Sequence, residues 1–512
     1  MNIRITIFCV LLIPFFCSPL QAQRGTLNVT VIDQQTGKQI PFRLHLKTAK
    51  GQIRKLPKAP FWTDHNTIES GNVELNLPVG NYQFEIESGP EYTTRSGRLE
   101  MPRFGNDSQT IPLQRVGQMR EANWFCADLD NRRSVLESPH IMAAEWLDFL
   151  PVISWNNSGK NYWESNPLPR PLVQNLNQNR ILFPCAGRYE VSGCVVNIFN
   201  MPEPILSSDA VNSRGDAVEY LRSLKQRFPE VWIDGANIAM EDLPIFVALG
   251  LLDSVEILDE NIGRNSVSVP NQGLPRDERF YPDVLDEARW KQDIYFHLLN
   301  CGFRIAPSAG SGSGESKNPV GYNRVYIKAN TSWSMTDFWD SLKKGQAIVT
   351  NGPLIIPSVN GFPPGHAFKG KTDVNGKPIP QSFTFGLTLA VREPISYIEI
   401  IKNGKIYATF RMDDAKKNAD NKLPPVEFSD SGWFLIRAVT DLPDTYRCAI
   451  SAPYYVEYNN KPYIDQKSVM FFQKWMLDLG KKLVEQKDKI PPERYKKLFS
   501  SWKEARDFWI KL

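Results

Sequence analysis

The side chains best suited to chemistry stand at the ends of apolar runs. Asp128, Asp130 and Arg132 lie where the run that begins at Trp124 gives way to polar residues, and Glu190 ends the run ILFPCAGRYE. Carboxylates can bind hard divalent cations or exchange protons with a substrate, and a guanidinium can bind an anionic or polyhydroxylated ligand. These residues predict either a carboxylate-rich metal site or a metal-free site in which Arg132 supplies the positive charge.

Polar residues at the ends of other apolar runs extend the candidate site: Trp155, Asn156, Asp234, Asn323 and Asn351. Trp155 and Asn156 could form a floor on which a sugar ring stacks. Asp234 could complete an oxygen-rich site for Mg²⁺, Ca²⁺ or Mn²⁺. The two later asparagines either contact a ligand or satisfy backbone groups in tight turns.

The histidine pattern narrows the chemistry. The chain has five histidines, and none of them forms an HxH, HxxH or HxxxH pair: His45, His65, His140, His297 and His366. A polynuclear metal centre needs neutral imidazoles, because several carboxylates alone repel one another. No G-x-S-x-G segment marks an activated serine either. We therefore expect neither a conventional polynuclear histidine centre nor a serine nucleophile.

The elements that would position these residues lie between 118 and 357. Apolar runs there alternate with segments of helical spacing, such as 217–227 and 335–343. This alternation predicts parallel strands joined by helices, hence an α/β barrel or open sheet of seven or eight strands. The carboxyl ends of such strands share one rim, so the candidate residues are expected to meet there.

Two segments with period-two alternation flank this part. Residues 25–117 predict an N-terminal β-sandwich, and residues 358–460 predict a second one, in which Asn403-Gly404 supplies the type I′ turn of a hairpin. Residues 461–512 predict a helical tail made of two helices, each with one apolar face.

Seven segments resemble the PHP (polymerase and histidinol phosphatase) superfamily, specifically its exported CehA/McbA-like metallohydrolases. They are NWFCADLDNRR, LDFLPVISWNN, DLPIFVALGLLDSVEIL, LPRDERFYPDVLDEARWKQDIYFHLLNCGFRIAPSAGSGSG, NPVGYNRVYI, GQAIVTNGPL and SGWFLIRA. The resemblance implies a distorted (β/α)7 barrel whose strand ends hold two or three divalent metals for hydrolysis of phosphoesters or related esters.

The metal-ligand motifs of that family are largely replaced in this chain. Where the family carries D-L-H-x-H, residues 128–132 are D-L-D-N-R, and where it carries G-S-D-x-H, residues 310–314 are G-S-G-S-G. Glu190 still matches the bridging glutamate of the family. Arg132 places a fixed cation where a ligand is expected, which disfavours a nearby metal ion.

The N-terminus and the composition predict where the protein works. Residues 1–22 predict a signal peptide, because Arg4 precedes an apolar stretch too short for a membrane span. The 60 Lys and Arg face 56 Asp and Glu without a long run of one sign, which argues against nucleic acid as a partner. We expect an exported protein, periplasmic or extracellular, with no integral membrane segment after signal removal.

Three functions remain open. The favoured one is a pseudoenzyme that binds a small polar or anionic ligand, including carbohydrate, through the candidate residues and without a cofactor. The second is an active metal-dependent phosphoester or ester hydrolase that holds Mn²⁺, Mg²⁺ or Zn²⁺ with Asp128, Asp130, Glu190 and Asp234. The third is a structural or adhesion protein.

Overall fold

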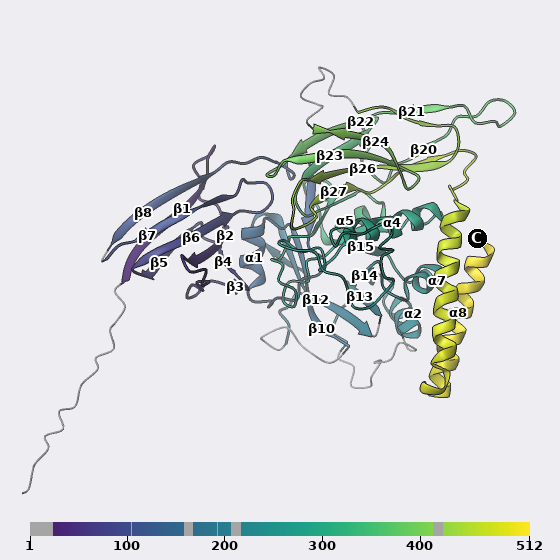
Figure 1. The fold of residues 1–512 in the computed structure, drawn as a ribbon, viewed down its shortest axis with the longest axis horizontal. Helices are drawn as coiled ribbons and strands as arrows, with labels where there is room; N and C mark the ends of the chain where they lie inside the picture. Colours follow the sequence, from purple (N-terminus) through teal and green to yellow (C-terminus); the bar gives the residue numbers. More distant parts are fainter. Residues whose placement is uncertain (1–23, 104, 158–166, 192, 206–216, 413–422) are drawn as a thin grey trace, which may run out of the picture.

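The computed structural model describes residues 24–512 apart from 104, 158–166, 192, 206–216 and 413–422. The protein is a mixed α/β protein with several β-sheets, one of them large and mixed, and a helical C-terminal region (Figure 1). The predicted signal peptide, residues 1–22, lies outside the described residues. Within the described chain, none of the helices combines the length and apolar character needed to cross a bilayer.

Two sheets, which we call the N-terminal sheets, form the first part of the chain. One has the order β5 (Asn72–Pro78), β1 (Arg24–Asp33), β8 (Asn106–Leu113); the other has the order β3 (Phe61–Trp62), β4 (His65–Ile68), β2 (Phe42–Thr48), β6 (Gly80–Glu87), β7 (Arg95–Met101). Alternate residues of β1 and β2 contribute to one apolar cluster that both sheets share. The period-two pattern of the sequence produces this burial, because successive strand side chains point to opposite faces.

The large sheet runs through the middle of the chain into its C-terminal half. Its strand order is β16 (Ala306–Ala309), β15 (Ser254–Leu258), β14 (Trp232–Gly235), β13 (Cys194–Phe199), β12 (Arg180–Val191), β10 (Phe149–Asn156), β9 (Trp124–Ala127), β17 (Arg324–Lys328), β18 (Ala347–Thr350), β27 (Cys448–Ser451), β26 (Gly432–Thr440), β23 (Ile395–Lys402), β24 (Lys405–Arg411). β11 (Gln174–Leu176) pairs with β12 at its side. The described strands form no closed ring of hydrogen bonds, whereas the sequence predicted a distorted barrel.

Strand direction in the large sheet differs in part from the prediction of parallel strands. β9, β10, β12, β14, β15 and β16 run in one direction, but β13 and β17 run against their neighbours. The prediction is wrong for these two strands. At β13 the reason is local, because the chain turns directly from β12 into β13 at Gly193, and a parallel pairing would need a crossover of a dozen residues or so.

The described helices between these strands are α1 (Ser138–Glu145), α2 (Ala217–Arg227), α3 (Leu243–Ala248), α4 (Asp286–Asn300) and α5 (Met335–Lys343). The expected helix at 335–343 is confirmed at both ends, and the one at 217–227 is confirmed at its end, Arg227, since residues 206–216 lie outside the described chain. α5 begins where it does because Ser334 and Asp337 form a capping box that satisfies free backbone N–H groups.

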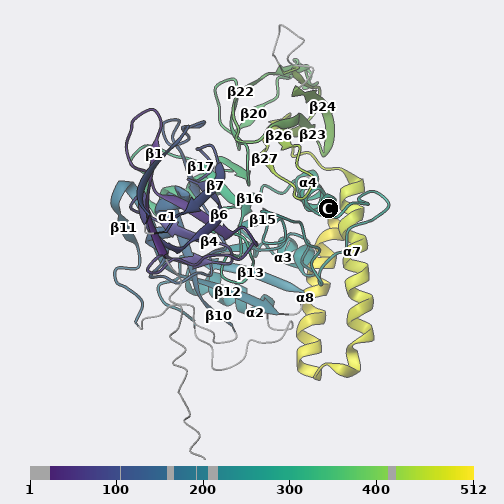
Figure 2. The same cartoon turned by 60° about the vertical axis from the view of Figure 1, so that its left-hand side comes forward.

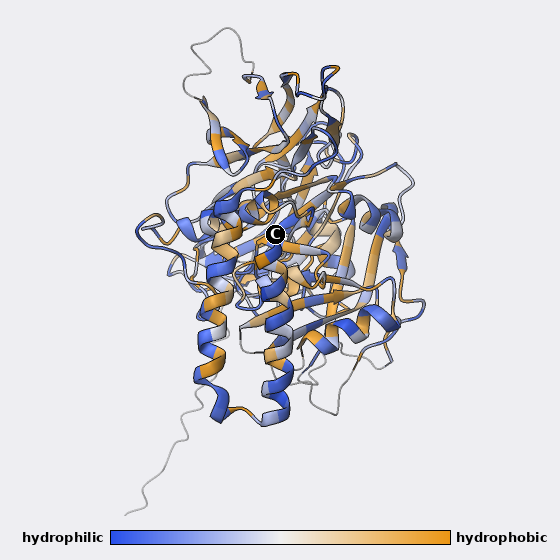
Figure 3. Ribbon diagram, turned by 90° about the vertical axis from the view of Figure 1, so that its right-hand side faces the viewer, coloured by the Kyte–Doolittle hydropathy of each residue, from blue (hydrophilic) through white to orange (hydrophobic). Residues whose placement is uncertain are grey.

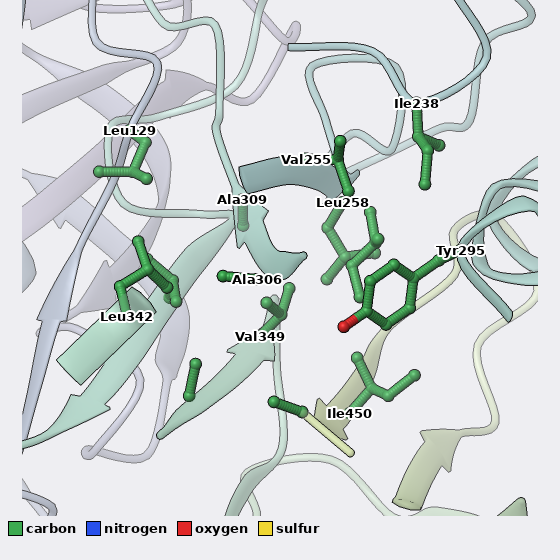
Figure 4. Packing of buried hydrophobic residues seen from close by; sticks show 14 of the residues in the cluster. Leu129, Ile238, Val255, Leu258, Tyr295, Ala306, Ala309, Leu342, Val349 and Ile450 are labelled. Carbon is green, nitrogen blue, oxygen red and sulfur yellow. The ribbon is translucent and has the colours of Figure 1, made fainter. Parts of the chain in front are cut away.

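One apolar cluster spans the central and C-terminal parts, from Met119 to Trp509. Figure 4 shows Val255 and Leu258 of β15 facing Tyr295 of α4, with Ile450 of β27 on the same side. Residues 358–460 therefore share both a sheet and a core with the central part. β28 (Tyr454–Glu457) pairs with β26 and with β20 (Ala367–Lys369), which adds both strands to the large sheet. Two small sheets pair β19 (Leu354–Val359) with β22 (Phe385–Ala390) and β21 (Gln381–Phe383) with β25 (Val426–Phe428).

The helical tail consists of α7 (Gln466–Glu485) and α8 (Pro492–Lys511), which lie side by side at the edge of the molecule away from the N-terminal sheets (Figures 1 and 2). Apolar stretches alternate with polar ones along both helices, as Figure 3 shows. The Asp465 carboxylate caps α7 at the backbone N–H of Lys467. Trp509 of α8 is fully buried, stacks on Phe472 of α7 and donates from Nε1 to the carbonyl of Pro244.

Candidate functional site

The carboxyl ends of β9, β10, β12, β14 and β15 lie at one edge of the large sheet, because these strands run in one direction. Asp130 follows β9, Arg188 and Glu190 stand near the end of β12, and Glu260 follows β15. The structure brings these four side chains together around the guanidinium of Arg188.

Asp130 is bound by two guanidinium groups. Arg132 donates to both of its oxygens, from Nε at 2.8 Å and from Nη2 at 2.5 Å. Arg188 adds a third hydrogen bond, from Nη1 to Oδ2 at 3.2 Å. Asp130 is 1% exposed, so this is a buried ion-paired network. Its carboxylate is fully engaged and points at no open position where a ligand could bind.

Arg132 and Arg188 each reach further carboxylates. Arg132 pairs with Glu315 at 2.7 Å and Glu260 at 3.1 Å. Burial lowers the pKa of Arg132, but Asp130 and Glu260 outweigh it, so this pKa lies well above its usual value. The guanidinium therefore stays charged.

Arg188 is held on three further sides. Its Nε donates to Glu190 at 2.9 Å, its Nη1 to Asn197 Oδ1 at 3.1 Å, and its Nη2 lies 3.5 Å from Glu260. Glu190 remains 61% exposed in its side chain. Four carboxylates thus surround two guanidinium groups, and the excess charge of the cluster is negative.

Asp128 holds backbone rather than a ligand. Its carboxylate accepts hydrogen bonds from the backbone N–H groups of Asp130 at 3.0 Å, Ser311 at 2.9 Å and Gly321 at 2.6 Å. Burial raises the pKa of Asp128 to about 6, against these hydrogen bonds, which lower it. The side chain ties the loop after β9 to the loop after β16.

Asp234 and Glu256 form a second buried carboxyl pair beneath the network. The hydroxyls of Ser254 and Ser308 donate to Asp234 Oδ1. Burial raises the pKa of Asp234 to about 6, and burial together with the Asp234 charge raises the pKa of Glu256 well above its usual range. Asn197 Nδ2 donates to Glu256 at 3.3 Å and connects this pair to Arg188.

A pocket of about 680 Å³ opens over the strand ends. Its polar lining includes Asn156, Arg188, Glu190, Asn237, Glu260 and Asn261. Burial raises the pKa of Glu260, although both arginines partly oppose the rise. We call this cavity the Arg188 pocket.

The strand ends do not fit the metal centre that the resemblance implies. Among the described residues, the groups of three or more His, Cys, Asp and Glu ligand atoms within 4.8 Å of one another all contain His45 and lie in the N-terminal sheets. Asp128, Asp130, Glu190 and Asp234 do not converge in this way. Two fixed guanidinium charges occupy the centre of the cluster, and they would repel a divalent ion.

Trp155 and Asn156 are neighbours in β10, but only Asn156 reaches the pocket. Asn156 lines the Arg188 pocket, but Trp155 is fully buried and lies so close to Gly187 that a Cβ there would fall 2.2 Å from its ring. The expected sugar-stacking floor is therefore not formed by Trp155. β10 is buried on both faces up to Trp155, so the apolar run did not show which of its residues would reach a pocket.

Asn323 and Asn351 satisfy backbone groups. Asn323 Nδ2 donates to the carbonyls of Asp259 at 2.8 Å and Gly310 at 3.1 Å. Asn351 donates to the carbonyl of Tyr446 and accepts from the N–H of Cys448. Neither residue lines the Arg188 pocket. The structure favours the turn-stabilising alternative of the two that the sequence left open.

Three residues of the network, Arg188, Glu260 and Glu315, were not among the sequence candidates. Arg188 stands two positions before Glu190, so the two side chains share one face of β12. This spacing of two residues was the sequence feature from which Arg188 could have been predicted as a neighbour of Glu190. Glu260 stands two positions after the end of β15, just as Asn237 stands two after β14.

Comparison with known proteins identifies no relative for the chain. No protein-family model matches it, and no curated protein matches it. Solved structures match short parts of it, among them the Bacillus anthracis TIE protein (16% identity, TM-score 0.15, 22% of this chain and 20% of that one), a streptococcal ancillary pilin (16%, 0.14, 22% and 38%) and a pilus-presented adhesin (15%, 0.10, 19% and 26%). Each match covers well under half of either chain, so none assigns a fold or a function to this protein.

Proposed function

We propose that this chain is an exported, PHP-like binding protein whose Arg188 pocket takes a neutral polyhydroxylated ligand such as a carbohydrate. The observation that carries the proposal is the paired guanidinium network at the strand ends, where the resemblance implies a metal centre. The fold supports the PHP-like part, since β16 lies beside β17 and β18 across the gap in the hydrogen-bonded order. Helices between like-directed strands fit a distorted barrel.

Charge decides the class of ligand. Asp130, Glu190, Glu260 and Glu315 outnumber Arg132 and Arg188, so no unneutralised positive charge is left for an anion. An anionic ligand would be repelled by the carboxylates at the pocket wall. The ligand is therefore expected to be uncharged, which narrows the polar or anionic ligand that the sequence predicted.

Hydrogen-bonding groups decide its chemistry. The pocket wall offers carboxylate acceptors from Glu190 and Glu260 and the side-chain amides of Asn156, Asn237 and Asn261. Amides both donate and accept, and hydroxyl groups do the same, so a polyol can pair with this lining without leaving a charge unmatched. A cavity of about 680 Å³ lies within the usual range for small-molecule sites.

The test is a thermal-shift screen of the purified chain. The panel contains neutral mono- and oligosaccharides, uronic acids, sulfated sugars and inorganic phosphate, all with EDTA. A binder at about 100 times its Kd adds about 2.7 kcal/mol to the free energy of unfolding. We expect neutral sugars to raise Tm, and Glu190→Gln to weaken that shift. Glu278→Gln, an exposed carboxylate outside the pocket lining, is the matched control.

Three outcomes would contradict the proposal. The first is that only the anionic sugars or phosphate raise Tm. The second is that no compound raises Tm. The third is that a neutral sugar raises the Tm of Glu190→Gln as much as that of Glu278→Gln. Each outcome would mean either that the Arg188 pocket does not bind the ligand or that the ligand is charged.

A second function is favoured by one observation. Glu190 and Glu260 both contact Arg188 at the pocket wall, and burial raises the pKa of Glu260 while Glu190 stays exposed. Two carboxyls with different environments can act as acid and base in glycoside hydrolysis. Release of the chromophore from aryl glycosides, lost in Glu190→Gln, would support this activity over binding alone.

A further inference from the structure

Two histidines of the N-terminal sheets face each other across neighbouring strands. His45 of β2 and His65 of β4 are direct partners in the antiparallel register, and their ring centroids lie 5.3 Å apart. Both are almost completely buried, with 6% and 4% exposed. A neutral imidazole offers one ring nitrogen as a metal ligand.

The Asp64 carboxylate lies against both rings. Its Oδ2 is 3.3 Å from His45 Nδ1, and its Oδ1 is 3.2 Å from His65 Nδ1. One ligand atom from each of the three residues falls within 4.8 Å of the others. Ligands held at about 2.0–2.1 Å in a tetrahedron lie about 3.3 Å apart. The two His–Asp separations are close to this value, and they also lie near the hydrogen-bond range.

The turn that carries Asp64 is strained. Thr63, which precedes it between β3 and β4, has a φ of +43°. A β-branched residue rarely adopts this region, and such strain persists where the surrounding structure holds it, often at ligand sites. The turn places Asp64 directly beside His65 and opposite His45.

One polar atom of the group has no partner. His45 Nε2 is buried and forms no hydrogen bond with the described residues. The Nδ1 atom of the same ring faces Asp64, so this open nitrogen shows that the imidazole is incompletely hydrogen-bonded and is not itself the proposed ligand atom.

A nearby pair of carboxylates is already occupied. Glu85 and Glu87 both accept hydrogen bonds from Arg264, and Glu87 also accepts one from Arg43. An ion at these two glutamates would have to displace a guanidinium. Asp64 contacts the two imidazoles instead, so it is the carboxylate best placed to hold a cation.

We propose that His45, Asp64 and His65 form a three-ligand site for a divalent transition metal of the zinc class. Two imidazoles and one carboxylate suit such ions, whereas Mg²⁺ and Ca²⁺ prefer all-oxygen sites. A pocket of about 700 Å³, lined in part by His45, Asp64 and Arg264, opens beside the group. In the proposed site, a fourth position open to this pocket would take water or a substrate, as in zinc sites that keep one position free.

The experiment titrates the EDTA-stripped full chain with Co²⁺ and follows the visible d–d absorption. We expect one tightly bound Co²⁺ per chain with the intense bands of tetrahedral coordination. Asp64→Asn and His65→Gln should each weaken binding at least about 100-fold, since even loss of outer-sphere partners costs about 10–100-fold. His140→Gln, an exposed histidine paired with Glu69, and Glu190→Gln at the Arg188 pocket should bind as the parent does.

Retained binding in Asp64→Asn and His65→Gln, or no saturable binding by the parent chain, would overturn the site. If a variant fails to fold by circular dichroism, X-ray absorption of the zinc-loaded parent decides: two imidazoles and no sulfur are expected, and fewer than two imidazoles overturn the site. The sugar screen is run with EDTA, so its outcome is independent of this one.

Discussion

Asp130 is the residue on which the strand-end network depends. Its carboxylate bonds Arg132 and Arg188, both of which are nearly inaccessible to solvent. Asp130→Asn removes the buried carboxylate that both guanidinium groups share, and removal of one partner from a buried ion pair costs about 3–5 kcal/mol. We expect urea unfolding of this variant to begin at lower concentration. Asp277→Asn, which breaks an exposed pair with Arg279, should unfold like the parent; equal effects would contradict the assignment.

Asp234 predicts a pH dependence. Burial raises its pKa from 3.8 to about 6. The folded state then binds the proton more tightly than the unfolded chain, so this group costs stability as pH rises through that interval. The side chain that Asp234→Asn introduces cannot ionise. The free energy of unfolding of this variant, relative to that of the parent, should therefore rise by up to about 3 kcal/mol between acid and neutral pH. Unfolding free energies of both proteins across this range test the prediction; a pH-independent difference would contradict it.

At the scale of elements, α8 is held by one side chain above all. Trp509 stacks on Phe472, with ring centroids 4.6 Å apart, and bonds the carbonyl of Pro244 at 2.9 Å. Trp509→Ala should destabilise the contact by about 3–5 kcal/mol, because a large buried ring leaves a cavity. Hydrogen exchange should then accelerate in α8 and α3. Phe499→Ala, at a 40% exposed position of the same helix, should not accelerate it; equal acceleration would contradict this role.

Elements with strong local signals could be predicted from the sequence. Asn403-Gly404 predicts a type I′ hairpin, and both residues adopt positive φ between β23 and β24. The bounds of α5 follow from Ser334 and Asp337. The direction of β13 and β17 could not be predicted in this way, because their apolar runs are the same for either direction of pairing.

At the scale of the whole molecule, the features that could not be predicted from the sequence arise from pairing between strands that are distant in the chain. β18 pairs with β27, so the C-terminal strands join the large sheet and share its core. The histidine pair arises in the same way, since β2 and β4 place His45 opposite His65 without any spacing motif. Asp128 and Asp130 could be predicted as candidates because they follow an apolar run. Trp155 could not be recognised as a core residue, because its strand is buried on both faces.

We have proposed that the guanidinium network stands in place of a metal centre and that the Arg188 pocket binds a neutral sugar. Isothermal titration calorimetry with the best sugar of the screen, with EDTA and then with added Mn²⁺, tests it most directly. We expect the parent chain to bind the sugar with the same affinity in EDTA and in Mn²⁺. We expect Glu190→Gln to bind the sugar more weakly in both. Binding that EDTA abolishes and Mn²⁺ restores would contradict the proposal, and would place a metal at the strand ends after all.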